Sequence, residues 1–196
     1  MSGRGREFVT LVVTFGVSFL VVAVGFGDWR FGLGFVLLIL VHELGHIAEA
    51  KRQGLEVSLP VFIPLIGAYV TYRHSGLAPW RTALISLAGP LAGGIGAAVA
   101  WEVGSARGTH WLVYLAYIGF FFNAANLLPV GILDGGSILR GIVQTWRRPA
   151  IRYENGVPVE ASAPERNRAV AVAVAYGLLA AGLVACAMAT RHSGAF

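Results

Sequence analysis

The chain has 196 residues, of which 56% are hydrophobic and only 13% charged, whereas a typical soluble domain is about 25% charged. This composition excludes a soluble globular domain, and the lack of a regular glycine spacing excludes a collagen-like repeat. The formal net charge of +5 indicates membrane topology rather than nucleic-acid binding, because basic residues collect in cytoplasmic loops. The sequence therefore predicts an all-α, polytopic membrane protein with the lipid bilayer as its surroundings, no nucleic-acid partner, and a single domain over residues 1–196.

Five apolar runs are long enough to cross the hydrocarbon core, which takes about 20 residues of helix. They cover about Phe8–Phe26, Phe31–Gln53, Trp80–Val103, His110–Trp146 and Val170–Thr190. The fourth run is too long for one crossing and contains Pro129 and Gly131, so we expect it to be broken there. The first run is not a cleavable signal peptide, because it is long and no small-residue cleavage site precedes the next run.

The basic residues orient these five spans. Of the 15 Lys and Arg residues, 12 fall on one side of a five-span topology; only Arg30, Arg107 and Arg191 fall on the other. The richer side is predicted to be cytoplasmic. We therefore expect a multi-pass protein of the cell membrane, with its N-terminus in the cytoplasm and its C-terminus outside.

Two segments lie between the predicted spans. Residues 149–168 are polar and are predicted to form a cytoplasmic loop with a small hairpin at Asn155–Gly156. Residues 54–75 are apolar and rich in β-formers, but Pro60, Pro64 and Gly67 interrupt them too often for a span. A short re-entrant or interfacial β-segment fits, and such backbone must be buried in protein or line a wet cavity.

The second span carries His42-Glu43-Leu44-Gly45-His46. Two histidines four residues apart lie one turn apart on one face of a helix, so both imidazoles can reach one metal ion. Glu43 can then serve as general base toward a metal-bound water. The alternative is a chance match, which the cost of placing an acid and two histidines in an apolar helix disfavours.

A zinc site that keeps one position open for water needs a third protein ligand. Asp134 is the only other acid that lies within a predicted span and away from its ends, and a position in the cytoplasmic half or near the middle of the membrane would let it meet the two histidines. The alternative for Asp134 is a helix N-cap that follows the break at Pro129 and Gly131.

Three motifs in order along residues 31–140 resemble the site-2 protease family of intramembrane zinc metalloproteases. They are His42–His46 followed by Ala50 and Gly54, then Gly89-Pro90-Leu91-Ala92-Gly93, then Asn126–Gly136. The resemblance implies one zinc ion per chain on His42, His46 and Asp134, with Glu43 as general base and Asn126 holding the substrate. It also implies a minimal, core-only member that cleaves membrane-protein substrates at a transmembrane helix, as in regulated intramembrane proteolysis.

This chain departs from many family members at Ile132, where they have a second proline, but no proposed ligand is lost. Asn123 and the glycines of the second motif are assigned to helix packing, and Gly135 and Gly136 are expected to leave room for a neighbouring helix. In the β-segment, Ala68, Tyr69 and Val70 are predicted to pair with an extended substrate, the alternative being a segment that only plugs the bundle. The rival functions are a membrane metal transporter or sensor that uses the same ligands without hydrolysis, and a binding scaffold with an inactive site.

Overall fold

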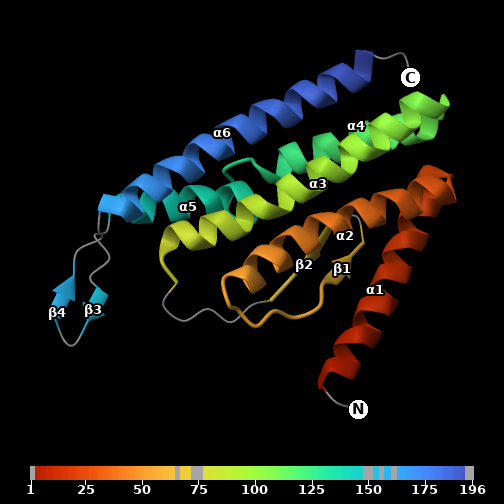
Figure 1. Cartoon of the computed structure of the whole chain (residues 1–196). Helices are drawn as coiled ribbons and strands as arrows, with labels where there is room; N and C mark the ends of the chain where they lie inside the picture. Colours follow the sequence, from red (N-terminus) through yellow and green to blue (C-terminus); the bar gives the residue numbers. More distant parts are fainter. Residues whose placement is uncertain are drawn as a thin grey trace.

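The computed structural model of the protein describes residues 3–64, 67–71, 77–147, 152–154, 157–159 and 163–192. Most of its helices lie side by side in an elongated bundle, whereas the first helix is set at a large angle to them, and a short β-hairpin lies beside the second helix (Figure 1). The helices are α1 (Gly3–Phe26), α2 (Trp29–Arg52), α3 (Pro79–Arg107), α4 (His110–Asn126), α5 (Asp134–Arg147) and α6 (Ala163–His192). The strands are β1 (Val61–Ile63), β2 (Gly67–Tyr69), β3 (Arg152–Glu154) and β4 (Val157–Val159).

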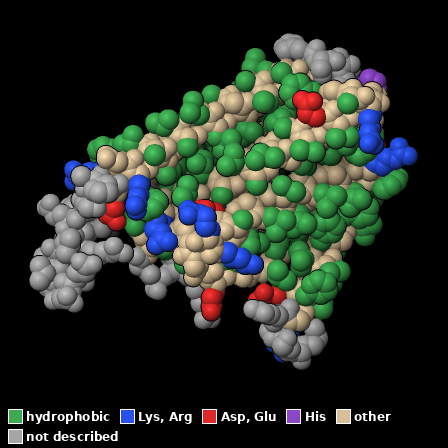
Figure 2. Space-filling model, in the orientation of Figure 1, with side chains coloured by type: hydrophobic (Ala, Val, Ile, Leu, Met, Phe, Trp, Pro, Cys, Tyr) green, Lys and Arg blue, Asp and Glu red, His purple; other side chains and the backbone are tan. Residues whose placement is uncertain are grey.

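Within the described ranges, α1, α2, α3 and α6 are long and apolar enough to cross a membrane. With 17 residues, α4 is slightly shorter, but it is strongly apolar and packs against α3 over much of its length. Hydrophobic side chains cover most of the visible helical face, while charged side chains collect toward the helix ends (Figure 2). Val24 is 81% exposed and Leu178 is 70% exposed, so these faces suit lipid rather than water. The prediction of a multi-pass, essentially all-α membrane protein is confirmed.

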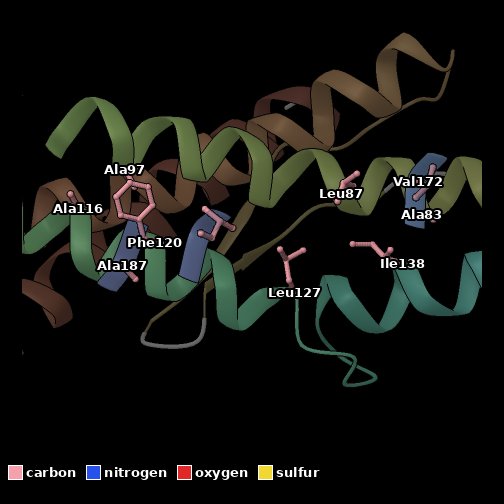
Figure 3. Packing of buried hydrophobic residues seen from close by; sticks show 10 residues of the cluster. Ala83, Leu87, Ala97, Ala116, Phe120, Leu127, Ile138, Val172 and Ala187 are labelled. Carbon is pink, nitrogen blue, oxygen red and sulfur yellow. The ribbon is translucent and has the colours of Figure 1, made fainter. Parts of the chain in front are cut away.

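Two apolar clusters hold the bundle together. One joins α3, α4, α5 and α6, and includes Leu87, Phe120, Leu127, Ile138 and Val172 (Figure 3). The other joins α1, α2, α4 and β1 and is centred on a different set of residues, namely Val22, Phe31, Val36, Leu38, Ile39, Phe62 and Leu115. Because α4 contributes to both clusters, it fixes the position of α2 relative to α5.

The predicted break in the fourth apolar run is confirmed. The helix α4 ends at Asn126, and α5 begins at Asp134, after a connection that contains Pro129 and Gly131. Asp134 is therefore the first residue of a new helix, which is free to point in a direction that a continuous helix would not allow.

Both predicted β-segments form antiparallel hairpins. In the first, Val61 pairs with Tyr69 and Phe62 pairs with Ala68. In the second, β3 pairs with β4 on either side of Asn155–Gly156, which itself lies outside the described residues.

Three of the predicted helix boundaries need correction. The first helix begins at Gly3 rather than at Phe8. The last helix begins at Ala163 rather than at Val170, so the polar loop is shorter than 149–168. Proline and acidic residues are favourable in a first helical turn, and Pro164 and Glu165 occupy that turn. The third helix continues beyond Val103 to Arg107, where Gly108 ends it in the left-handed conformation with φ 62°.

Candidate metal centre

The two histidines of α2 lie in the interior of the bundle. Asp28 caps the start of the helix by accepting a hydrogen bond from the Arg30 amide at 2.8 Å. His42 is 3% exposed, and its Nε2 lies 3.1 Å from the Nε2 of His46, one turn further along. The four-residue spacing therefore brings the same ring nitrogen of both residues to one point, as predicted.

The carboxylate of Asp134 meets these nitrogens. Its Oδ2 lies 3.1 Å from the Nε2 of His42, and its Oδ1 lies 3.4 Å from the Nε2 of His46. The three side chains form a cluster of metal-ligating type, the one found among the described residues. Asp134 is the first residue of α5 rather than the N-cap before it, and its carboxylate is directed at the histidines.

The connection between α4 and α5 is held from two sides, which fixes where α5 begins. The hydroxyl of Tyr176 on α6 donates to the carbonyl oxygen of Leu127 at 2.6 Å. Arg140 donates to the carbonyl oxygen of Gly131 at 3.2 Å. No sequence signal indicated the role of Tyr176, because the contact joins residues far apart in the chain.

Gly135 and Gly136 were predicted to make room for a neighbouring helix, and this is wrong. A Cβ on Gly135 would collide with the carbonyl oxygen of Leu127, and a Cβ on Gly136 would collide with that of Val130. These glycines instead let the connection fold closely over the first turn of α5, directly beside Asp134.

The other ring nitrogen of each histidine has a hydrogen-bond partner. His46 Nδ1 lies 2.8 Å from the carbonyl oxygen of Ile85 on α3. His42 Nδ1 lies 2.8 Å from Oδ1 of Asn123, whose Nδ2 donates to the carbonyl oxygen of Gly119 at 2.7 Å. Asn123 had been assigned to packing, and this is corrected. Its signal was available in the sequence, since an amide buried in an apolar helix needs partners.

A cavity of about 230 Å³ opens onto the cluster. Its lining includes every residue that the sequence predicts as general base, metal ligand or substrate contact, namely His42, Glu43, His46, Ala68, Tyr69, Val70, Asn126 and Asp134. Ile85, Ser86, Ile132 and Ser137 complete the lining. Ser86 and Ser137 add hydroxyl groups that the sequence analysis did not consider. The cavity therefore joins α2, α3, the α4–α5 connection and the β1–β2 hairpin at one place.

Two polar side chains of the lining, Glu43 and Asn126, are not part of the cluster of metal-ligating residues. Glu43 is 5% exposed, on the helix turn between the two histidines. Asn126, at the end of α4, is half-buried, and its Nδ2 donates to the carbonyl oxygen of Phe122 at 3.1 Å. An amide nitrogen carries two hydrogens, so Asn126 can make this bond and donate to a ligand as well.

The sequence matches the profile of Peptidase family M50 over residues 30–108 and 102–157. The chain belongs to this family, the site-2 protease family. The match spans well over half of the chain and contains all three residues of the cluster, so it confirms the resemblance found in the sequence.

Several proteins named as zinc metalloproteases are similar to this chain. The zinc metalloprotease MJ0392 of Methanocaldococcus jannaschii is 29% identical over 147 residues, which cover 69% of this chain and 42% of that protein. The putative zinc metalloprotease sll0528 of Synechocystis is 31% identical, covering 59% of this chain and 32% of that protein. The putative zinc metalloprotease Rip3 of Mycobacterium tuberculosis is 30% identical, covering 80% of this chain and 42% of that protein. The chain thus spans less than half the length of these relatives, and no solved structure matches it.

Proposed function

We propose that this chain is an intramembrane zinc metalloprotease that hydrolyses peptide bonds in or near membrane-spanning segments of other membrane proteins, in regulated intramembrane proteolysis. The observation that carries the proposal is the convergence of His42, His46 and Asp134 in a cavity that also contains Glu43. Membership of family M50 and the names of the relatives as zinc metalloproteases support it.

The donor atoms of the cluster fit a zinc ion. Carbonyl and amide oxygens only accept hydrogen bonds, so Ile85 and Asn123 hold the ring protons on the Nδ1 atoms, and both Nε2 lone pairs face the Asp134 carboxylate. Three acceptors that converge in this way are stabilised by a cation. Their spacing of 3.1–3.4 Å agrees with the roughly 3.3 Å between neighbouring ligand atoms that lie about 2.0–2.1 Å from a tetrahedral Zn²⁺.

Glu43 is proposed as the general base and His42, His46 and Asp134 as the ligands. Zn²⁺ bound by these residues would polarise the scissile carbonyl and make a water molecule more acidic. Glu43 takes the proton from the attacking water and passes it to the leaving amine, so that a carboxylic acid and an amine result. Asn126, which lines the same cavity, is proposed to donate an amide hydrogen to the substrate carbonyl.

The β1–β2 hairpin is proposed to bind the substrate as an added strand. The Phe62 amide donates to the hydroxyl of Thr14 on α1 at 3.2 Å, so Phe62 and its partner Ala68 form a pair that exchanges no ladder hydrogen bonds. Backbone directions alternate along a strand, so the amides of Ala68 and Val70 point to the edge away from β1. Among the described residues no hydrogen bond pairs these two amides, and both residues line the cavity. An extended substrate could therefore pair with this edge beside the catalytic residues.

The topology is proposed to be N-terminus inside and C-terminus outside, in the cell membrane, as the 12 to 3 distribution of basic residues indicates. A reporter that works only outside the cytoplasm, fused after Phe196, should be active. An inactive fusion beside an active cytoplasmic reporter would contradict this topology.

The test of the proposed function begins with the protein purified in detergent and its metal content. The protein is then incubated with several single-span membrane proteins, and the wild type is compared with Glu43→Gln. Zinc at about one ion per chain, with cleavage by the wild type alone, is the expected result. Metal transport, the rival function, has no supporting observation, since the described residues contain one metal-type cluster rather than ligands at successive depths. Zinc uptake into vesicles by Glu43→Gln, without proteolysis by the wild type, would favour it.

A further inference from the structure

We infer that Asn123, seated against Gly93, is a positioning residue that decides which ring nitrogen of His42 is available to the metal. The inference deepens the proposed function and rests on its assignment of His42 as a ligand. It joins two residues that the motif on α2 does not contain, one from α3 and one from α4.

The orientation of the Asn123 amide follows from its two partners. The carbonyl oxygen of Gly119 lies 2.7 Å from one amide atom and can only accept, so that atom must be the nitrogen. The amide oxygen then faces His42 Nδ1 at 2.8 Å and can only accept as well. His42 must donate from Nδ1, and a neutral imidazole has one proton, so Nε2 retains its lone pair.

Burial makes this arrangement obligatory. Asn123 is 1% exposed, so water cannot replace either hydrogen bond if one is lost. The two histidines are thus held differently, because His46 bonds a backbone carbonyl that no substitution at Ile85 removes, whereas His42 depends on a side chain.

Gly93 supplies the space that Asn123 occupies. A Cβ at Gly93 would collide with the amide group of Asn123, and a Cβ at Gly89, one turn earlier on α3, would collide with the imidazole of His46. Glycines four residues apart often serve helix packing alone. Here both glycines lie against groups of the candidate metal centre. On α3, Gly89 leaves space for the imidazole of His46, and Gly93 leaves space for the amide group that bonds His42.

The experiment uses the full chain in detergent with two readouts. The first is the protonation of the two ring nitrogens of His42 in zinc-loaded protein, by ¹⁵N NMR of histidine-labelled samples, with the His42 signal assigned from its loss in His42→Gln. The second is zinc affinity by chelator competition, with the Co²⁺ absorption spectrum as a check on geometry. In the wild type we expect the Nδ1–H tautomer.

Asn123→Ala should give a mixture of tautomers and weaken zinc binding about 10- to 100-fold, the usual effect of losing a hydrogen-bond partner of a ligand. Asn123→Asp keeps an acceptor oxygen and should restore most of the affinity. Gly93→Ala should resemble Asn123→Ala, and the double variant should be no worse than Asn123→Ala alone, since the amide group that the added methyl would displace is then absent. Gly96→Ala is the matched control on the same helix, because the atoms nearest its Cβ would belong to the side chains of Leu38 and Val41 and not to Asn123 or a histidine.

The inference is overturned if Asn123→Ala folds and leaves both the tautomer and the zinc affinity unchanged. It is also overturned if Asn123→Asp is as weak as Asn123→Ala. Should Asn123→Ala fail to fold, Gly93→Ala measured against Gly96→Ala decides the question with the same readouts. A wild-type protein that binds no zinc contradicts the proposed function instead, whereas a wild type that binds zinc beside an unaffected Asn123→Ala contradicts only the inference.

Discussion

Two walls of the same cavity are built in opposite ways. On the α2 wall, His42 and Glu43 are at most 5% exposed, and each histidine is tied to a partner on another helix. On the hairpin wall, Tyr69 is 51% exposed and the strands are three residues long. Hydrogen bonds from the backbone to Thr14 and Glu7 tie this wall to α1. One wall is suited to hold chemical groups in fixed positions, and the other to accept a partner strand.

The comparison shows how one small bundle can separate catalysis from substrate binding. Polar groups in a membrane are costly unless each has its hydrogen-bond or charge partner, and both histidines of the α2 wall have such partners. An exposed strand edge retains unpaired backbone groups, which is a liability in a soluble protein but a binding site beside a reactive centre. Substitutions on the two walls should therefore separate zinc content from cleavage.

The largest effect is expected from Glu43→Gln. Loss of the general base should reduce cleavage by about 10²- to 10⁴-fold, the range found for positioned acid–base groups, while zinc stays bound. His46→Ala on the same wall should instead lower the zinc content. Metal analysis and a cleavage assay on both variants separate the two roles; wild-type cleavage by Glu43→Gln would refute the mechanism, and stoichiometric zinc in His46→Ala would refute the ligand set.

The second largest effect is expected from Asp134→Asn. It is nearly isosteric but removes the negative charge, so we expect zinc affinity to fall at least as far as the roughly 10- to 100-fold loss seen when ligands lose their partners, and cleavage to be abolished. Asp134→Glu keeps the charge but moves it by one methylene, and should retain some metal with poor turnover. Equal zinc affinity and active cleavage in Asp134→Asn would mean that the third ligand is another residue.

A proline on the outer edge of the hairpin tests the opposite wall. Ala68→Pro or Val70→Pro removes an amide that points away from β1, so cleavage should fall severalfold with zinc retained. Ala68→Val keeps the amide and is the matched control, whereas Tyr69→Pro removes an inward amide and should disrupt the hairpin itself. Unchanged cleavage in both outer-edge variants would show that the hairpin does not bind the substrate and only fills space in the bundle.

The smallest effect is expected at the link between the hairpin and α1. Thr14→Val removes the hydroxyl that accepts from the Phe62 amide, a net cost of about 0.5–1.5 kcal/mol, so cleavage should fall about two- to tenfold with zinc unchanged. Thr10→Val, one turn earlier on the same helix and exposed, is the control. A loss of zinc in Thr14→Val would show that the two walls are coupled after all.

The sequence alone determined the parts of this protein that depend on local spacing. Two histidines four residues apart must share a helix face, so two of the three proposed ligands could be predicted from the sequence of α2 alone. The long apolar runs determined the membrane-spanning character, and Pro129 and Gly131 located the break that frees Asp134. Asp134 was found by elimination, because few acids lie in apolar segments.

Only the tertiary structure decided which groups complete the centre. Asn123 meets His42 across 81 positions of sequence, and Tyr176 reaches Leu127 across 49, contacts that no local periodicity encodes. For the same reason Gly93 was assigned to helix packing, and Gly135 and Gly136 to the wrong neighbour. A glycine in a sequence signals that space is needed, but the group that fills the space is chosen by helices that meet only after folding.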